Sequence, residues 1–134
     1  MKFENSDYSK SLDYFKLNLH FGNFYLCEFF FIAELNEGVH FGREQVEELI
    51  KQIIFFYGES PKLGCISNRV NSYSSDPHSW SKVENKYDIV IASAIVSYTP
   101  ITSMNAKIEQ QFFKKRIKNC TSLKEAIKWI ENPK

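Results

Sequence analysis

The sequence has few of the residues that characterise secreted, disulfide-bonded or metal-binding proteins. Only three cysteines, Cys27, Cys65 and Cys120, occur in 134 residues, and they form no Cys-x-x-Cys pair. An odd number of widely spaced cysteines in apolar, strand-like contexts predicts buried reduced thiols. No His-x-x-x-His pattern or cluster of carboxylates at ligand spacing occurs either, so we expect no bound metal and no cofactor.

The chain also lacks long apolar runs and an excess of either charge. Its most apolar stretch, residues 24–33, includes Glu28 and is far shorter than the roughly 20 apolar residues of a membrane-spanning helix. The first residues carry charge where a secretory signal is apolar, so we expect a cytoplasmic protein without a membrane span. The 17 Lys and Arg residues balance 16 Asp and Glu residues, which gives no electrostatic reason to expect a nucleic-acid partner.

Aromatic side chains are abundant, at 16% of the residues, and include 12 Phe. We expect any aromatic surface that the core cannot hold to line a pocket or a subunit interface. A homodimer through the Phe-rich N-terminal hairpin is therefore one open alternative. Length and composition predict one globular domain at residues 11–134, preceded by a flexible polar segment at residues 1–10.

The spacing of apolar residues predicts a hairpin followed by alternating strands and helices. Residues 15–21 alternate between apolar and polar side chains, Gly22-Asn23 has the composition of a two-residue turn, and residues 24–35 would form the partner strand. The later expected elements are a helix from about Arg43 to a C-cap at Gly58, a strand at 63–66, a helix at 77–84, a strand at 89–96, a helix from Pro100, a strand at 116–120 and a helix at 123–130. This order predicts an α/β fold with a mixed, mostly parallel four- to five-stranded sheet, an N-terminal β-hairpin and about four helices.

Two of these helices are expected to begin with a cap residue followed by proline, at Asp76-Pro77 and Thr99-Pro100. Because parallel strands end at the same edge of a sheet, the loops before these helices should lie side by side there. The helix that begins at Pro100 has four large apolar residues at helical spacing, which we expect to face inward: Ile101, Met104, Ile108 and Phe112.

The loop over residues 68–77 is the expected functional site, because it combines hydroxyl, amide and charged groups with a helix N-terminus. Arg69 could bind a phosphate or carboxylate through two hydrogen bonds. The residues expected to bind a ligand or partner are Asn68, Arg69, Asn71, Ser72, Tyr73, Ser74, Ser97 and Thr99. A structural alternative stays open, in which Asp76 only caps the helix, Arg69 pairs with Glu37, and the loop side chains bond to their own backbone through Asn71, Ser72 and Ser74.

The element order and three segments resemble the STAS-like superfamily, which includes the bacterial anti-sigma-factor antagonists. The segments are Asn68-Arg69-Val70-Asn71-Ser72-Tyr73-Ser74, Ala106-x-Ile108-Glu109-x-x-Phe112-Phe113 and Leu123-x-Glu125-Ala126-Ile127-x-Trp129-Ile130. The similarity covers residues 11–131 and is greatest to small stand-alone bacterial STAS-like proteins. It implies a STAS-like domain.

The resemblance also implies a place for regulation. Well-studied antagonists are switched by phosphorylation of a serine at a strand-to-helix junction, which changes their binding to a partner kinase. The matching junction here is residues 72–77, with Ser74 as the first candidate phosphoacceptor, followed by Ser72 and Ser75. This sequence reads Tyr-Ser-Ser-Asp-Pro where the antagonists have an Asp-Ser-Ser-Gly-like arrangement, so the resemblance assigns the role to none of the three.

We therefore expect a non-enzymatic regulatory or protein-interaction module of STAS-like type, with a protein partner that the sequence does not identify. No catalytic residue is expected, since no Gly-x-Ser-x-Gly elbow accompanies the serines. The alternative is a small-molecule binding protein for an anionic or an apolar, lipid-like ligand. Both functions would use the edge formed by residues 68–77 and 97–99.

Overall fold

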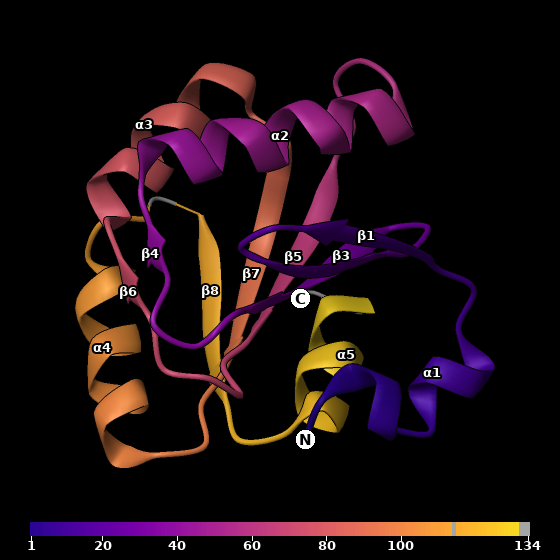
Figure 1. Ribbon diagram of the computed structural model, residues 1–134, viewed down its shortest axis with the longest axis vertical. Coiled ribbons are helices and arrows are strands. Elements are labelled where there is room, and N and C mark those ends of the chain that lie inside the picture. The colour runs from indigo at the N-terminus through magenta and orange to yellow at the C-terminus, as the bar shows by residue number, and fades with distance from the viewer. Residues whose placement is uncertain (114, 132–134) are drawn as a thin grey trace.

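A six-stranded sheet with helices on both faces organises the computed structural model, which describes residues 1–113 and 115–131 (Figure 1). In spatial order the strands are β1 (Phe15–Leu19), β2 (Gly22–Leu26), β3 (Phe30–Leu35), β5 (Leu63–Asn68), β7 (Val90–Val96) and β8 (Arg116–Cys120). The first three strands are antiparallel, whereas β3, β5, β7 and β8 are parallel. The short strands β4 (His40–Phe41) and β6 (Ser74–Ser75) form a separate parallel pair.

Three helices share one face of the sheet: α2 (Arg43–Tyr57), α3 (Pro77–Tyr87) and α4 (Pro100–Gln110). The helix α5 (Leu123–Glu131) covers the other face together with the 3-10 turn η1 (Phe3–Asn5) and the short helix α1 (Tyr8–Ser11). Each face has its own apolar core. The α/β class and the mostly parallel sheet predicted from the sequence are confirmed, with six strands in the main sheet where four to five were expected.

The N-terminal hairpin differs from the prediction in its turn and in its number of strands. The turn lies at residues 20–21, and Gly22 belongs to β2. A Cβ atom at Gly22 would lie 2.7 Å from the carbonyl oxygen of Glu34, so glycine here permits close strand pairing and does not form the turn. The expected strand at 24–35 is two strands, because the chain reverses at Cys27, whose N–H donates to the Phe30 carbonyl at 2.9 Å.

The first ten residues, expected to be a flexible segment, form η1 and α1 and pack against the sheet. Phe3 is 0% exposed and packs against the rings of Tyr14 and Tyr25, at centroid distances of 5.0 and 4.7 Å. The segment is therefore part of the apolar core on the α5 face of the sheet. The polar composition of residues 1–10 did not indicate this packing, because one buried aromatic side chain is enough to attach a short segment to the core.

The apolar residues of α4 face outward, so the prediction that they face inward is wrong. Ala106 and Glu109 are the buried residues of this helix. A small residue allows the helix to approach the sheet closely, and Glu109 has a cationic partner there. The large apolar residues of the helix occupy another side and are exposed by 72, 64 and 53% at Ile101, Met104 and Ile108 respectively. Phe112, two residues beyond the end of the helix, is exposed by 41%. We call these four residues the α4 stripe.

Candidate functional site

The site predicted from the sequence lies where β5 and β7 end. Asn68 and Val96 are paired at the carboxyl ends of these parallel strands, and the Arg69 N–H donates to the Val96 carbonyl at 3.1 Å. The helices α3 and α4 begin nearby, with Asp76 and Thr99 as their N-caps. The expectation that the two loops share one edge of the sheet is therefore correct.

Arg69 forms a buried ion pair with Glu109 of α4, and not with Glu37 as the structural alternative held. The guanidinium binds both carboxylate oxygens, with a distance of 2.7 Å between Nη2 and Oε1, and both side chains are only 10% exposed. Burial alone would lower the pKa of Arg69, but the hydrogen bonds and negative charge of Glu109 outweigh it and raise that pKa. Since its charge is already neutralised, Arg69 is poorly suited to bind an external anion.

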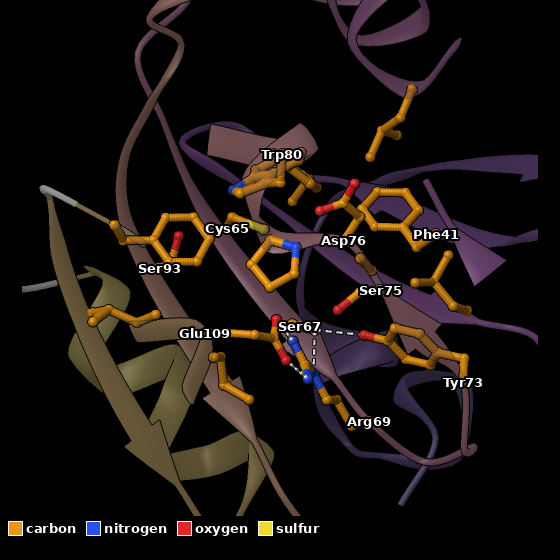
Figure 2. Close-up of a pocket in the computed structure, with 18 residues that line it drawn as sticks. Phe41, Cys65, Ser67, Arg69, Tyr73, Ser75, Asp76, Trp80, Ser93 and Glu109 are labelled. Atoms are coloured by element: carbon orange, nitrogen blue, oxygen red, sulfur yellow. Dashed lines mark hydrogen bonds and ion pairs between the residues drawn. The ribbon is translucent and has the colours of Figure 1, made fainter. Parts of the chain in front are cut away.

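Two further contacts hold the Arg69 side chain in place. Its Nε donates to Ser67 Oγ at 3.1 Å, and the same hydroxyl lies 3.2 Å from the phenol oxygen of Tyr73 (Figure 2). The guanidinium carbon also lies 5.4 Å from the centre of the Tyr73 ring. The predicted site residues Arg69 and Tyr73 thus belong to a fixed network between the loop, β5 and α4.

This network forms one wall of a mainly apolar cavity of about 70 Å³ between the sheet and helices α3 and α4 (Figure 2). Aromatic side chains make up much of the lining: Phe31, Phe41, Trp80 and Phe113. Polar atoms and one thiol also line the cavity, and they belong to Cys65, Ser67, Ser75, Asp76 and Ser93. The volume is well below the ~150 Å³ of an engineered cavity that binds benzene, so in this state it has room for only a very small ligand.

Asn68 is buried and connects the N-terminal segment to the sheet. Its amide nitrogen donates to Glu34 Oε2 at 2.7 Å and to the Met1 carbonyl at 2.9 Å, and its amide oxygen accepts from the Tyr98 hydroxyl at 2.6 Å. The same Glu34 oxygen accepts from the Phe3 N–H at 2.7 Å. Asn68 is therefore committed to structural hydrogen bonds that sequence reasoning did not foresee.

The protonation of Glu34 gives a prediction about pH. Burial raises the pKa of Glu34, against the opposing effect of the hydrogen bonds from Phe3 and Asn68. A carboxyl group with a raised folded-state pKa stabilises the fold when protonated, and this contribution is lost as pH rises through that pKa. We expect E34Q, which keeps an acceptor oxygen without the charge, to be more stable than the wild type at pH 7.

This advantage should shrink as pH falls through the raised pKa of Glu34 and should be lost below about 4.3, the ordinary pKa of Glu, because the wild-type carboxyl is then protonated in both states. Urea unfolding of both proteins near neutral pH and in acid measures the difference. An advantage of E34Q that grew on acidification would contradict the assignment.

The remaining polar residues of the loop bond to neighbouring segments. Asn71 Nδ2 donates to the Leu35 carbonyl at 3.0 Å, and the Ser72 N–H donates to Glu37 Oε2 at 2.6 Å. Asp76 caps α3, where Oδ1 accepts from the N–H groups of His78 and Ser79 at 3.1 and 3.3 Å. The structural alternative is thus correct about Asp76, whereas Asn71 bonds across to β3 and not to its own turn.

The candidate phosphoacceptors differ in their surroundings. Ser72 and Ser74 are exposed, and Ser74 Oγ lies 2.8 Å from Nδ1 of His40. Ser75 is partly buried and lines the cavity. A modifying enzyme could reach Ser72 and Ser74 more readily than Ser75, and modification of any of them stays a prediction.

Ser97 and Thr99 face a different hollow from the cavity beside Arg69. They line a depression together with Ser103, Asn119 and Thr121. Thr99 Oγ1 accepts from the Thr102 N–H at 3.1 Å as the cap of α4. The predicted site residues therefore share one edge of the sheet but do not converge on one ligand position.

The three cysteines are buried and unpaired, as the sequence predicted. Burial raises the pKa of Cys27 and Cys65 to about 12 and that of Cys120 to about 11. Thiols with such pKa values are poor nucleophiles near neutral pH. Across residues 1–113 and 115–131, no group of three or more His, Cys, Asp or Glu side chains is placed to hold a metal ion.

Sequence reasoning missed Glu34, Glu109 and Trp80 as partners of the site. Glu109 had a detectable signal, because it is the single acidic residue at positions 100–113 and follows Ala106 by three positions, which places both on one side of a helix. Glu34 gave no comparable signal, since nothing local marks an acidic residue within an apolar strand as the partner of a distant asparagine.

Comparison with known proteins establishes the fold. No protein-family model and no curated protein sequence matches the chain significantly. Among solved structures, it is similar to an uncharacterised protein of the DUF3478 family from Shewanella loihica PV-4, described as having a SpoIIAA-like fold. The TM-score is 0.56 at 10% identity, over 89% of this chain and 93% of that chain. The protein thus has a SpoIIAA-like, or STAS-like, fold. No helix of the described residues is long and apolar enough to cross a membrane.

Proposed function

We propose that this protein is a non-enzymatic protein-interaction module and that the outer face of α4 binds its partner. The observation that carries the proposal is the α4 stripe, in which three large apolar side chains of α4 and Phe112, just beyond the end of the helix, are exposed together. Contiguous apolar patches on small proteins are restricted in size and often mark interaction sites. The STAS-like fold supports the proposal further, because the antagonists that it resembles act by binding other proteins.

The charges around the stripe indicate the chemistry of the partner. Lys107 is exposed next to Ile108, whereas Glu109, the single acidic residue of α4, is buried against Arg69. The outer face of this helix is therefore apolar with a positive charge. An apolar groove with an acidic rim would complement it, in the manner of an amphipathic helix bound in a groove.

The predicted loop has a supporting role in this proposal. Arg69 holds Glu109 and so fixes the rotation of α4 about its axis, which keeps the stripe directed outward. Thr99 caps the same helix at its N-terminus. Phosphorylation of Ser74, beside His40, would add negative charge on the same side of the sheet as α4 and could modulate binding.

The proposal predicts that I101E strongly weakens partner binding without affecting the fold. Burial of an isoleucine side chain contributes about 1.5–3 kcal/mol, so the substitution should weaken binding by about tenfold or more. A photo-crosslinking residue at Met104, introduced in the native host, should capture a partner in the wild-type background and lose it with I101E. Thermal unfolding should be the same in both proteins.

Phe29 provides a matched control, because it is exposed to the same extent as Ile101, at 72%, but lies in the turn between β2 and β3. F29E should leave the crosslink at Met104 intact. The proposal fails if no protein is captured at Met104, or if I101E and F29E reduce capture equally.

Binding of a small apolar molecule is a second candidate function, favoured by the cavity beside Trp80. The anionic version of this alternative loses its main support, since Glu109 neutralises Arg69. Titration with small apolar molecules while following the fluorescence of Trp80 in a W129F variant, which lacks the second tryptophan, distinguishes this function from protein binding, because the α4 stripe is not part of the cavity lining.

A further inference from the structure

We propose that β1 pairs with the β1 strand of a second copy, so that two sheets join into one across an antiparallel, two-fold contact centred on Leu17. This inference goes beyond the proposed function, because it concerns the opposite edge of the sheet from the one next to α4. It also gives a physical form to the homodimer that the aromatic composition left open.

The position of β1 makes its backbone available. In the strand order of the main sheet, β1 is the first strand and has β2 as its neighbour on one side. An edge strand presents a row of N–H and C=O groups that another strand can bind. Proteins often block such edges with proline, a bulge or charged side chains, especially lysine. β1, with the sequence Phe-Lys-Leu-Asn-Leu, has no proline and pairs with β2 in a regular register, and its one charge, on Lys16, is paired with Glu4.

The side chains of β1 are divided between two faces. Phe15, Leu17 and Leu19 point to the α2 side, where Phe15 stacks on Phe56 at a centroid distance of 5.1 Å. Lys16 points to the other side, where it forms an ion pair with Glu4 at 2.9 Å. Phe15 remains 50% exposed even though it is stacked, so the apolar side of this edge is incompletely covered within one molecule.

Antiparallel pairing centred on Leu17 is compatible with this pattern. It places Leu17 opposite Leu17 of the second copy and Phe15 opposite Leu19, which joins the two apolar faces on one side of the sheet. On the other side, Lys16 lies opposite Asn18, so no like charges meet. The edge is therefore complementary to itself, as a two-fold contact requires.

The other edge of the sheet behaves differently. β8 carries Arg116 and Lys118 among its five residues. The equivalent antiparallel contact, centred on Lys118, would place two ammonium groups directly opposite each other, which is destabilising. Charge therefore disfavours this self-pairing of β8, whereas the equivalent contact of β1 brings no like charges together.

The available area suits a reversible dimer. A Phe side chain buries about 150–250 Å², so the half-exposed Phe15 and Phe56 offer roughly 400 Å² over two copies. The strand backbones, Leu17 and Leu19 add to this area and bring it toward the ~1,000 Å² that a specific interface needs. We therefore expect a concentration-dependent dimer.

Opposite charges placed at Asn18 test both the contact and its register. Asn18 is exposed and lies opposite Lys16 in the proposed dimer, twice by symmetry. N18K should weaken dimerisation by roughly 3- to 30-fold, and N18E should strengthen it by a similar factor. Sedimentation equilibrium over a range of protein concentrations measures both constants. N105K, the same change at an exposed position of α4, has the same net charge as N18K and should match the wild type.

A wild-type protein that stays monomeric at all concentrations would overturn the proposal. Two further results would overturn it, because the contact would then not include this register. One is a dimer whose dissociation constant responds equally to N18K and N105K. The other is a dimer whose dissociation constant shifts in the same direction with N18K and N18E. Loss of crosslinking at Met104 with I101E is independent of these results, so the two proposals can fail separately.

Discussion

Replacing Arg69 with alanine is expected to lower the free energy of unfolding by about 3–5 kcal/mol, because it leaves the Glu109 carboxylate buried without a cation. The side chains of both residues are only 10% exposed, and the guanidinium binds both carboxylate oxygens. Ser67 and Tyr73 would lose their contact with the guanidinium as well. Urea unfolding followed by circular dichroism measures the change.

Arg43 offers a matched control for this experiment. It forms an ion pair with Glu47 at 2.7 Å, one turn apart on the surface of α2, where both side chains are well exposed. Because solvent and salt screen such pairs, R43A should change the stability little. The double variant R69M/E109L should recover most of the stability lost in R69A, since apolar residues of similar size often replace a buried ion pair without loss. Equal effects of R69A and R43A would contradict the burial of the Arg69–Glu109 pair.

This expectation changes the functional interpretation of Arg69. From the sequence, an arginine in a polar loop at the end of a strand suggested an anion contact. In the structure its partner is Glu109, which is 40 residues further along the chain. The sequence contains both residues but does not show that they lie close together in space, because the contact depends on how α4 crosses the sheet. An ion pair between distant elements is therefore less predictable than the elements themselves.

The local features of the fold were the easiest to predict. The helix starts at Pro77 and Pro100 follow from short-range capping rules, and the side chains of Asp76 and Thr99 accept the expected backbone hydrogen bonds. Gly58 ends α2 with a φ of 95°, a value that favours glycine. These features need only a few neighbouring residues, so one sequence is enough to identify them.

The orientation of α4 could not be predicted by the same reasoning. Helical spacing identifies an apolar side of the helix, but it does not tell whether that side meets the core or a partner. In this fold Ala106 and Glu109 meet the sheet, and the α4 stripe is left at the surface. Large apolar side chains at helical spacing usually face the core, and here they are exposed. This difference is the strongest indication that α4 presents an interaction surface.

The N-terminal segment provides the second prediction with a large effect. Substitution of Phe3 by alanine should cost about 3–5 kcal/mol of stability, as is typical of fully buried Phe side chains. Its ring is 0% exposed and packs against Tyr14 and Tyr25. Thermal or urea unfolding measures the loss, and F55A is a control in which the same change is made at an exposed position of α2.

The effect of F3A should extend beyond the lost packing. The Phe3 N–H and the Met1 carbonyl are bonded to Glu34 and Asn68, so a detached segment also removes partners from two buried polar side chains. Deletion of residues 1–5 should therefore destabilise the protein more than F3A alone, because each unsatisfied buried group costs about 1–3 kcal/mol. If F3A and F55A have equally small effects, the first residues are the flexible segment that their polar composition suggested. A large effect of F3A together with an additional loss on deletion would show that the fold includes its N-terminus, through one aromatic ring and the hydrogen bonds that anchor it.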